Sequence, residues 1–138
     1  HIGLHCTGQD AVFTLKNALE RRNIDPKITG LVVRSDNGPQ FVSQAFEQAC
    51  SSFGIEHERI PVKTPNKNAH IEAFHRLIED DCLSINEFGT FAHAYMAIVE
   101  YMDYYNNIRI HSSLKYLPPV EYYKAILARE IEPSVVRV

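Results

Sequence analysis

The pattern of apolar and polar positions along the chain predicts helices over most of its length. A first helix begins at a polar cap, Thr7 or Asp10, and ends near Pro26, which lacks the backbone N–H that a helix interior needs. Ser43 caps a second helix, whose apolar residues share one face, and Gly54 ends it. These residues predict where two amphipathic helices begin and end.

The second half of the sequence predicts three more helices. Their expected bounds are about 68–83, 90–105 and 118–127. A proline pair opens the last of them, because proline suits the first turn of a helix. Glu72 falls near the start of the first one, where the helix dipole favours a carboxylate.

Short apolar runs predict strands between and before these helices. The run "LVVRS" at 31–35 is nearly continuous, which is typical of a strand covered on both faces. The run "IEHERIP" at 55–61 alternates, with Ile55 and His57 on one side, which favours a strand nearer a sheet edge. "HIGLH" at 1–5 is a candidate for a further short strand. The order strand, helix, strand indicates an α/β fold.

Length and composition indicate a soluble, folded protein. The 138 residues suffice for one hydrophobic core, and 45% of them are apolar and 22% charged. We expect one domain over 1–127, followed by a C-terminal tail over 128–138. No signal-peptide or membrane-spanning pattern is present, so the expected location is the cytosol. The widely spaced Cys6, Cys50 and Cys82 are expected to be reduced and mostly buried.

Two carboxylates stand out by their positions. Asp36 ends the apolar strand just before a turn at Asn37 and Gly38, and 35 residues separate it from Glu72 at the start of a helix. Carboxylates placed in this way can converge on two Mg²⁺ or Mn²⁺ ions about 4 Å apart, the arrangement used for phosphoryl transfer on nucleic acid. Taken singly, Asp-Asn-Gly is more often a plain turn, and an early helical Glu is more often a surface acid.

The sequence around both acids favours a functional role over a plain turn and a surface acid. "RSDNGPQF" at 34–41, the gap of 35 residues, and "TPNKNAHIEAFHRLIEDDCL" at 64–83 are followed by a tail with the pattern Y-N-x-x-R-x-H-S-S-L-x-Y-x-x-P-x-E-Y. Together, over about 31–124, these motifs resemble the catalytic core of the integrase and transposase family with a D, D-35-E acid triad. That family includes bacterial insertion-sequence transposases and retroviral-type integrases.

The resemblance implies a ribonuclease-H-like fold, which is a mixed sheet flanked by helices. It implies DNA hydrolysis and strand transfer at two Mg²⁺ or Mn²⁺ ions, with Asp36 as the second acid of the triad and Glu72 as the third. The implied partners are DNA, as transposon ends and target, and further copies of the chain. The implied location is the bacterial cytoplasm, with no membrane contact.

No residue of the sequence matches the first acid of the triad, which in the family lies on the first strand of the sheet. Asp10 has the position of a helix-start residue instead. We therefore expect the chain to be N-terminally truncated, to lack the first strand or strands, and to be inactive alone. The apolar edge beside 31–35 would then be exposed and would promote self-association or poor stability.

The net charge of −3 has the wrong sign for holding DNA by bulk electrostatics, so any contact must be local. Lys63 and Lys67, in the loop before Glu72, and Arg76, one turn after it, are the candidate phosphate contacts. Many relatives place a second basic residue where this chain has Glu79. An equally supported alternative is that Lys63 and Lys67 are solvated loop residues that do not contact DNA.

Two alternatives to a transposase core stay open. The chain could be an inactive core remnant that acts only as a packing or nucleic-acid-binding module, because the first acid is absent. It could also be another ribonuclease-H-like nuclease, such as a junction-cleaving enzyme, which the tail "YNNIRIHSSLKY" disfavours.

Overall fold

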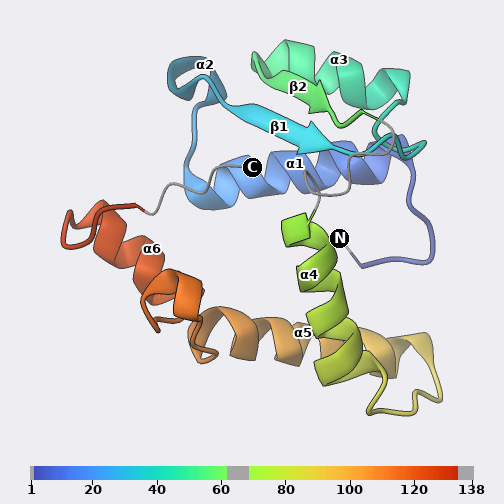
Figure 1. The fold of residues 1–138 in the computed structure, drawn as a ribbon. Helices are drawn as coiled ribbons and strands as arrows, with labels where there is room; N and C mark the ends of the chain where they lie inside the picture. The colour runs from blue at the N-terminus through green and yellow to red at the C-terminus, as the bar shows by residue number, and fades with distance from the viewer. Residues whose placement is uncertain (1, 62–68, 134–138) are drawn as a thin grey trace. The chain divides into compact units, whose positions relative to one another are not determined.

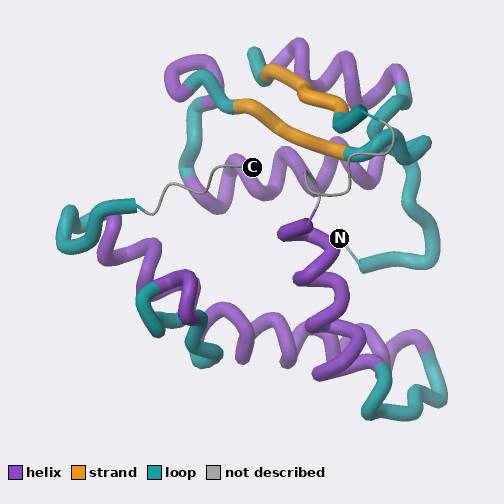
Figure 2. Tube along the Cα trace, viewed as in Figure 1, coloured by secondary structure: helices purple, strands orange, loops and turns teal. Residues whose placement is uncertain are grey.

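The computed structural model describes residues 2–61 and 69–133 (Figure 1). The chain divides into two compact units, His1–Ala69 and His70–Val138, and each is described by itself. Figure 2 shows that the strands belong to the first unit and that the second is helical. In the described part of the chain, no helix is long and apolar enough to cross a membrane.

The first unit is a strand, helix, strand arrangement preceded by helices. Its elements are α1 (Gly8–Arg22), α2 (Pro26–Thr29), β1 (Val32–Ser35), α3 (Gln44–Phe53) and β2 (Glu56–Arg59). The two strands run parallel, in a register that pairs Val32 with Glu56 and Ser35 with Arg59. Because parallel strands need a crossover connection, α3 lies between them in the sequence.

Local chemistry sets the helix ends as the sequence predicts. Thr7 caps α1 and forms a reciprocal capping box with Asp10, which confirms Asp10 as a helix-start residue. The Ser43 side chain accepts a hydrogen bond from the backbone N–H of Phe46 at the start of α3. Gly54 ends α3 with φ of 71°, a left-handed conformation that glycine adopts without strain.

Phe46 is the centre of the first unit's core. Its exposed fraction is 2%, and it clusters with Ala11 of α1, Cys50 of α3 and Ile55. The Phe41 ring meets it edge-on with centroids 5.4 Å apart. The apolar faces of α1 and α3 therefore bury the same cluster, which holds the two helices against each other.

The sheet is covered on one face only within this unit. Val33 packs against the core cluster, and Ser35 is buried. On the other face Val32 is 48% exposed, and Arg34 forms an ion pair with Glu58 of β2 at 2.9 Å. The expectation that residues 31–35 are covered on both faces is thus wrong for the described residues of the first unit, because alternate side chains of β1 point away from the core that α1 and α3 form.

The predicted strand at 1–5 is also wrong where the structure describes it. Residues 2–6 have no strand conformation, and the chain enters α1 directly from Thr7. A strand is stabilised by a hydrogen-bonded neighbour, and the described sheet contains only β1 and β2. No strand before β1 is present in the described residues.

The second unit packs helices around α5. Its elements are α4 (Ala69–Ile78), the π-helical turn η2 (Glu79–Leu83), α5 (Phe91–Asn107), the 3₁₀ turn η3 (Ser112–Leu114) and α6 (Pro119–Leu127). Both η2 and α6 contact α5. The helices at 68–83 and 90–105 are confirmed in position, although the last turn of the first widens into a π-helix.

The cysteines follow the expectation in part. All three are free thiols; Cys50 and Cys82 are buried, and Cys6 is exposed. Burial raises the pKa of the Cys50 and Cys82 thiols, which disfavours the reactive thiolate. The two buried cysteines are therefore packing residues.

Replacing Phe46 with Ala should destabilise the first unit strongly. The substitution leaves a cavity in the core, and losses of about 3–5 kcal/mol are typical of such a change. Urea denaturation measures the effect. Phe13→Ala is the matched control, because Phe13 lies on α1 with 58% of its surface exposed and should cost far less. Equal losses in both variants would contradict this account of the core.

Candidate active site

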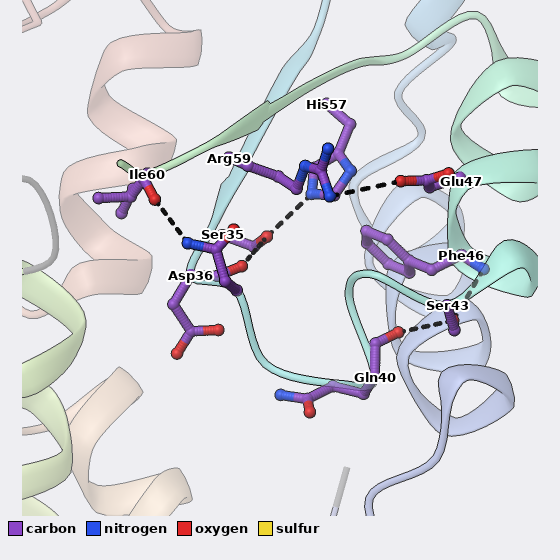
Figure 3. A network of polar contacts seen from close by, with 10 residues as sticks. Ser35, Asp36, Gln40, Ser43, Phe46, Glu47, His57, Arg59 and Ile60 are labelled. Carbon is purple, nitrogen blue, oxygen red and sulfur yellow. Dashed lines mark hydrogen bonds and ion pairs between the residues drawn. The ribbon is translucent and has the colours of Figure 1, made fainter. Parts of the chain in front are cut away.

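Asp36 lies directly after the last residue of β1, where the chain leaves the sheet. Its Oδ1 accepts a hydrogen bond from the backbone N–H of Gly38 at 2.8 Å, which closes a tight turn around the carboxylate. The side chain is exposed and points away from the Ser35 and His57 pair (Figure 3). The strand end thus presents a carboxylate to solvent with one oxygen already oriented.

Two hydrogen bonds tie the residues on either side of Asp36 to β2 and its continuation. The Ser35 hydroxyl lies 2.8 Å from His57 Nε2, and the Asn37 side-chain amide donates to the carbonyl of Ile60 at 2.8 Å (Figure 3). The Ser35 hydroxyl also donates to the carbonyl of Asp36 at 2.9 Å. The backbone that carries the carboxylate is therefore held from both sides.

From the sequence alone, Ser35 and His57 have no assigned role, and Asn37 is only part of a turn. One signal was present, since the alternation along 55–61 separates His57 from its charged neighbours Glu56 and Glu58. A histidine on the covered side of a strand needs a polar partner for its ring nitrogens. That partner could be named only once the register of the strands was known.

Glu72 lies in the first turn of α4, as the sequence predicts, and its side chain is exposed. The positive end of the helix dipole favours a carboxylate there. Asp36 belongs to the first unit and Glu72 to the second, so the structure places each acid within its own unit only.

The predicted DNA contacts differ in how far the structure describes them. Arg76 lies one turn after Glu72, and its Nε is 3.4 Å from Asp80 Oδ2 in an exposed ion pair. Such a pair contributes little stability and can exchange for a phosphate. Lys63 and Lys67 lie in 62–68, outside the described residues.

The donor chemistry of both acids suits a hard divalent cation. Mg²⁺ and Mn²⁺ are held through carboxylate oxygens, and Asp36 and Glu72 both present exposed carboxylates. Within residues 2–61 and 69–133, no cluster of three or more His, Cys, Asp or Glu side chains is arranged to hold a metal. The two acids fit the chemistry of such an ion as separate donors.

A buried tyrosine forms hydrogen bonds with the end of α4 and with the turn η2 that follows it. The hydroxyl of Tyr101, on α5, lies 3.3 Å from the carbonyl of Leu77 and 3.2 Å from Asp81 Oδ2. Burial first, and then the bond to Asp81, raise the pKa of Tyr101 to about 12, so the phenol stays protonated. Arg109 Nη2 lies 3.5 Å from the same Asp81 oxygen. The tail motif thus contributes Arg109 to the support of α4 and η2.

The aromatic residues of α5 have more than one role. Tyr101 is buried, and the Tyr105 ring packs edge-on against Phe74 of α4 with centroids 5.2 Å apart. Tyr95 and Tyr104 are exposed. Tyr101 and Tyr105 are therefore packing residues that contact η2 and α4.

His111, from the tail motif, packs its ring against Tyr105 with centroids 4.8 Å apart. Its Nε2 is buried and has no hydrogen-bond partner among the described residues. Burial lowers the pKa of His111, and the nearby charge of Arg109 lowers it further. The neutral imidazole is therefore the form that the fold favours.

The fold resembles that of a solved ribonuclease-H-like protein. The catalytic core domain of BIV integrase superposes with a TM-score of 0.66 over 95% of this chain and 80% of that chain, at 18% identity. At this identity the similarity establishes the fold, a small sheet with helices of the ribonuclease-H-like class. The predicted fold class is confirmed.

Sequence comparisons define the family. Two family models, both described as Integrase core domain, match residues 2–65 and 53–119. An uncharacterized 39.2 kDa protein of insertion element IS476 from Xanthomonas euvesicatoria is 41% identical over 90 residues, which are 65% of this chain and 26% of that protein. The transposase of insertion sequence element IS904 from Lactococcus lactis is 30% identical over 69% of this chain and 38% of its own length.

The chain belongs to the integrase core domain family of integrases and transposases. The two models together span most of it, and its relatives come from mobile elements. The chain covers about a quarter to two-fifths of the length of these two relatives.

Acid should destabilise the second unit through His111. Because the folded-state pKa lies below the ordinary 6.5, the unfolded chain binds the proton more readily. The stability that neutral His111 contributes is therefore fully present above about pH 6.5 and is lost as the pH falls through the folded-state pKa.

His111→Phe tests this effect, since the new ring keeps an aromatic contact with Tyr105 and cannot ionise. Urea denaturation at about pH 7 and pH 5 should show a larger loss of stability in the wild type than in the variant. Substituting the exposed His93 with Gln should leave the wild-type difference unchanged. An identical pH dependence in wild type and His111→Phe would refute the role of His111.

Proposed function

We propose that this chain forms part of the catalytic core of a bacterial insertion-sequence transposase, which cleaves DNA and joins transposon ends to target DNA. The observation that carries the proposal is the position of Asp36 at the end of β1, within a chain of the integrase core family and separated from Glu72 by 35 residues. The family supports polynucleotidyl transfer as the reaction class. The bacterial cytoplasm is the proposed location, in keeping with the bacterial sources of both relatives.

Asp36 and Glu72 would hold the divalent ions, Mg²⁺ or Mn²⁺, that this chemistry uses. When bound, such ions activate the attacking hydroxyl or water and stabilise the leaving oxygen. Asp36 contributes a carboxylate whose Oδ1 is oriented by the N–H of Gly38. Glu72 contributes a carboxylate from the first turn of α4. The first acid of the triad, which no residue of this sequence matches, stays a prediction.

DNA is the proposed partner, together with further copies of the chain, since two transposon ends must be joined in one reaction. The chain carries a net charge of −3, so phosphate contacts must come from local basic residues. Lys63, Lys67 and Arg76 are the proposed contacts. Arg76 is already exposed beside Asp80, where a phosphate can compete for its guanidinium.

Removing either acid should abolish the reaction. In a protein that carries this sequence with the segment before it, Asp36→Asn and Glu72→Gln should each reduce Mg²⁺-dependent strand transfer to background, because the amide is a poor ligand for a hard cation. A strand-transfer assay with labelled DNA measures this, and circular dichroism should show an unchanged fold.

The control for lost charge is Glu100→Gln, which neutralises an exposed acid on α5 and should keep full activity. Activity retained by either active-site variant would refute the assignment. A fully inactive wild-type protein that still binds DNA would instead favour the remnant alternative.

Removing a basic contact should weaken DNA binding equally for all sequences. Each of Lys63→Gln, Lys67→Gln and Arg76→Gln should make the negative slope of log affinity against log salt shallower by about 0.9, since one phosphate contact is lost. Fluorescence anisotropy at several salt concentrations measures the slope. Lys16→Gln is the control, because Lys16 pairs with Glu20 on α1 and should leave the slope unchanged. An unchanged slope in all three variants would favour solvated lysines with no role in binding.

A further inference from the structure

The hydrogen bonds on both sides of Asp36 come from a histidine and an asparagine with no assigned role. His57, on β2, reaches Ser35 of β1 at 2.8 Å, and Ser35 in turn donates to the carbonyl of Asp36 at 2.9 Å. Both contacts are satisfied at once when Nε2 of His57 carries a proton and donates to the hydroxyl. A polar chain thus runs from His57 to the backbone of the acid.

His57 is itself held by the core. Its ring meets the ring of Phe46 edge-on with centroids 5.1 Å apart, and Phe46 is 2% exposed. The strand register places His57 beside Val33, on the sheet face that packs against the core cluster. The position of the imidazole is therefore set by one of the two most buried side chains among the described residues of the unit (Figure 3).

We propose that His57 is a positioning residue for Asp36: it transmits the rigidity of the core through Ser35 to the backbone that presents the carboxylate to the metal. This inference rests on the proposed function of Asp36 as a metal ligand. Asn37 acts on the other side of the acid, where its amide holds the carbonyl of Ile60 at 2.8 Å. Three hydrogen bonds thus hold the turn: Ser35 bonds to the backbone carbonyl of Asp36, the Asn37 side chain bonds to Ile60, and the N–H of Gly38 bonds to Oδ1 of Asp36.

Fixing the turn matters because a metal ligand must be held in its binding geometry before the ion arrives. Partners that orient a ligand without touching the metal are worth about 10–100-fold in metal affinity or activity. The contact needs a hydrogen on Nε2 of His57, because the Ser35 hydroxyl already donates its own hydrogen to the carbonyl of Asp36.

The competing explanation is that His57 only fills space against Phe46. Two substitutions separate the explanations, because each keeps one property of the ring. His57→Phe keeps an aromatic ring against Phe46 and removes the N–H donor. His57→Gln keeps an amide N–H donor within reach of Ser35 and removes the ring.

The test is a Mn²⁺ titration of the ¹⁵N-labelled chain, followed by paramagnetic broadening of the backbone amide signals of Asp36, Asn37 and Gly38. His57→Phe should raise the Mn²⁺ concentration at half-broadening about tenfold. His57→Gln should stay close to the wild type. Without metal, the Gly38 amide signal should shift in His57→Phe and keep its position in His57→Gln, because it reports the bond to Asp36 Oδ1.

Glu58→Gln is the matched control, since it alters the other cross-strand contact, the 2.9 Å pair with Arg34 on the opposite face of the sheet. It should leave both readouts unchanged. Asp36→Asn should abolish the broadening; if it does not, Asp36 is not a ligand and the proposed function itself fails.

If Asp36→Asn abolishes broadening while His57→Phe binds Mn²⁺ as the wild type does, the positioning role is overturned and the metal site stands. If His57→Gln instead binds Mn²⁺ more weakly than His57→Phe does, the positioning role is also overturned, and packing against Phe46 is the role of the ring.

Discussion

The arrangement around Asp36 depends on the burial of one ring, that of Phe46. This ring packs edge-on against both Phe41 and His57 and is almost completely excluded from solvent. Since α3 carries Phe46 and also connects β1 to β2, the same contact fixes the helix against the two parallel strands. An apolar interaction in the core thereby governs a polar turn at the surface, because the strand ends cannot move without disturbing the packed ring.

The second unit is built on the same relation between a buried aromatic residue and an exposed acid. Tyr101 is buried and uses its hydroxyl to hold Leu77 and Asp81, the end of the helix that begins near Glu72. Arg109 adds a charged contact to Asp81. The tail motif is therefore part of the support for α4. In both units the acid itself stays exposed, as the proposed function requires.

Under the proposed function, a chain with a net charge of −3 needs a local means of holding DNA. The exposed pair of Arg76 with Asp80 is weak in water, so the guanidinium is available to a phosphate at little cost. The carboxylates of Asp36 and Glu72 would repel DNA phosphates in the absence of metal. Divalent ions and basic side chains thus have complementary parts in the proposed function, since both offset negative charge near the backbone of the nucleic acid.

The sequence by itself determined the helix ends and the spacing of the acids. Thr7, Ser43 and Gly54 act through bonds to residues a few positions away, so their roles can be inferred from neighbours in the chain. Only the tertiary structure decided that 1–5 forms no strand where it is described, and that Val32 is exposed. It also decided that His57 meets Ser35. These outcomes depend on which strands pair, in which register, and which face a helix covers, and such long-range contacts leave no local pattern in the sequence.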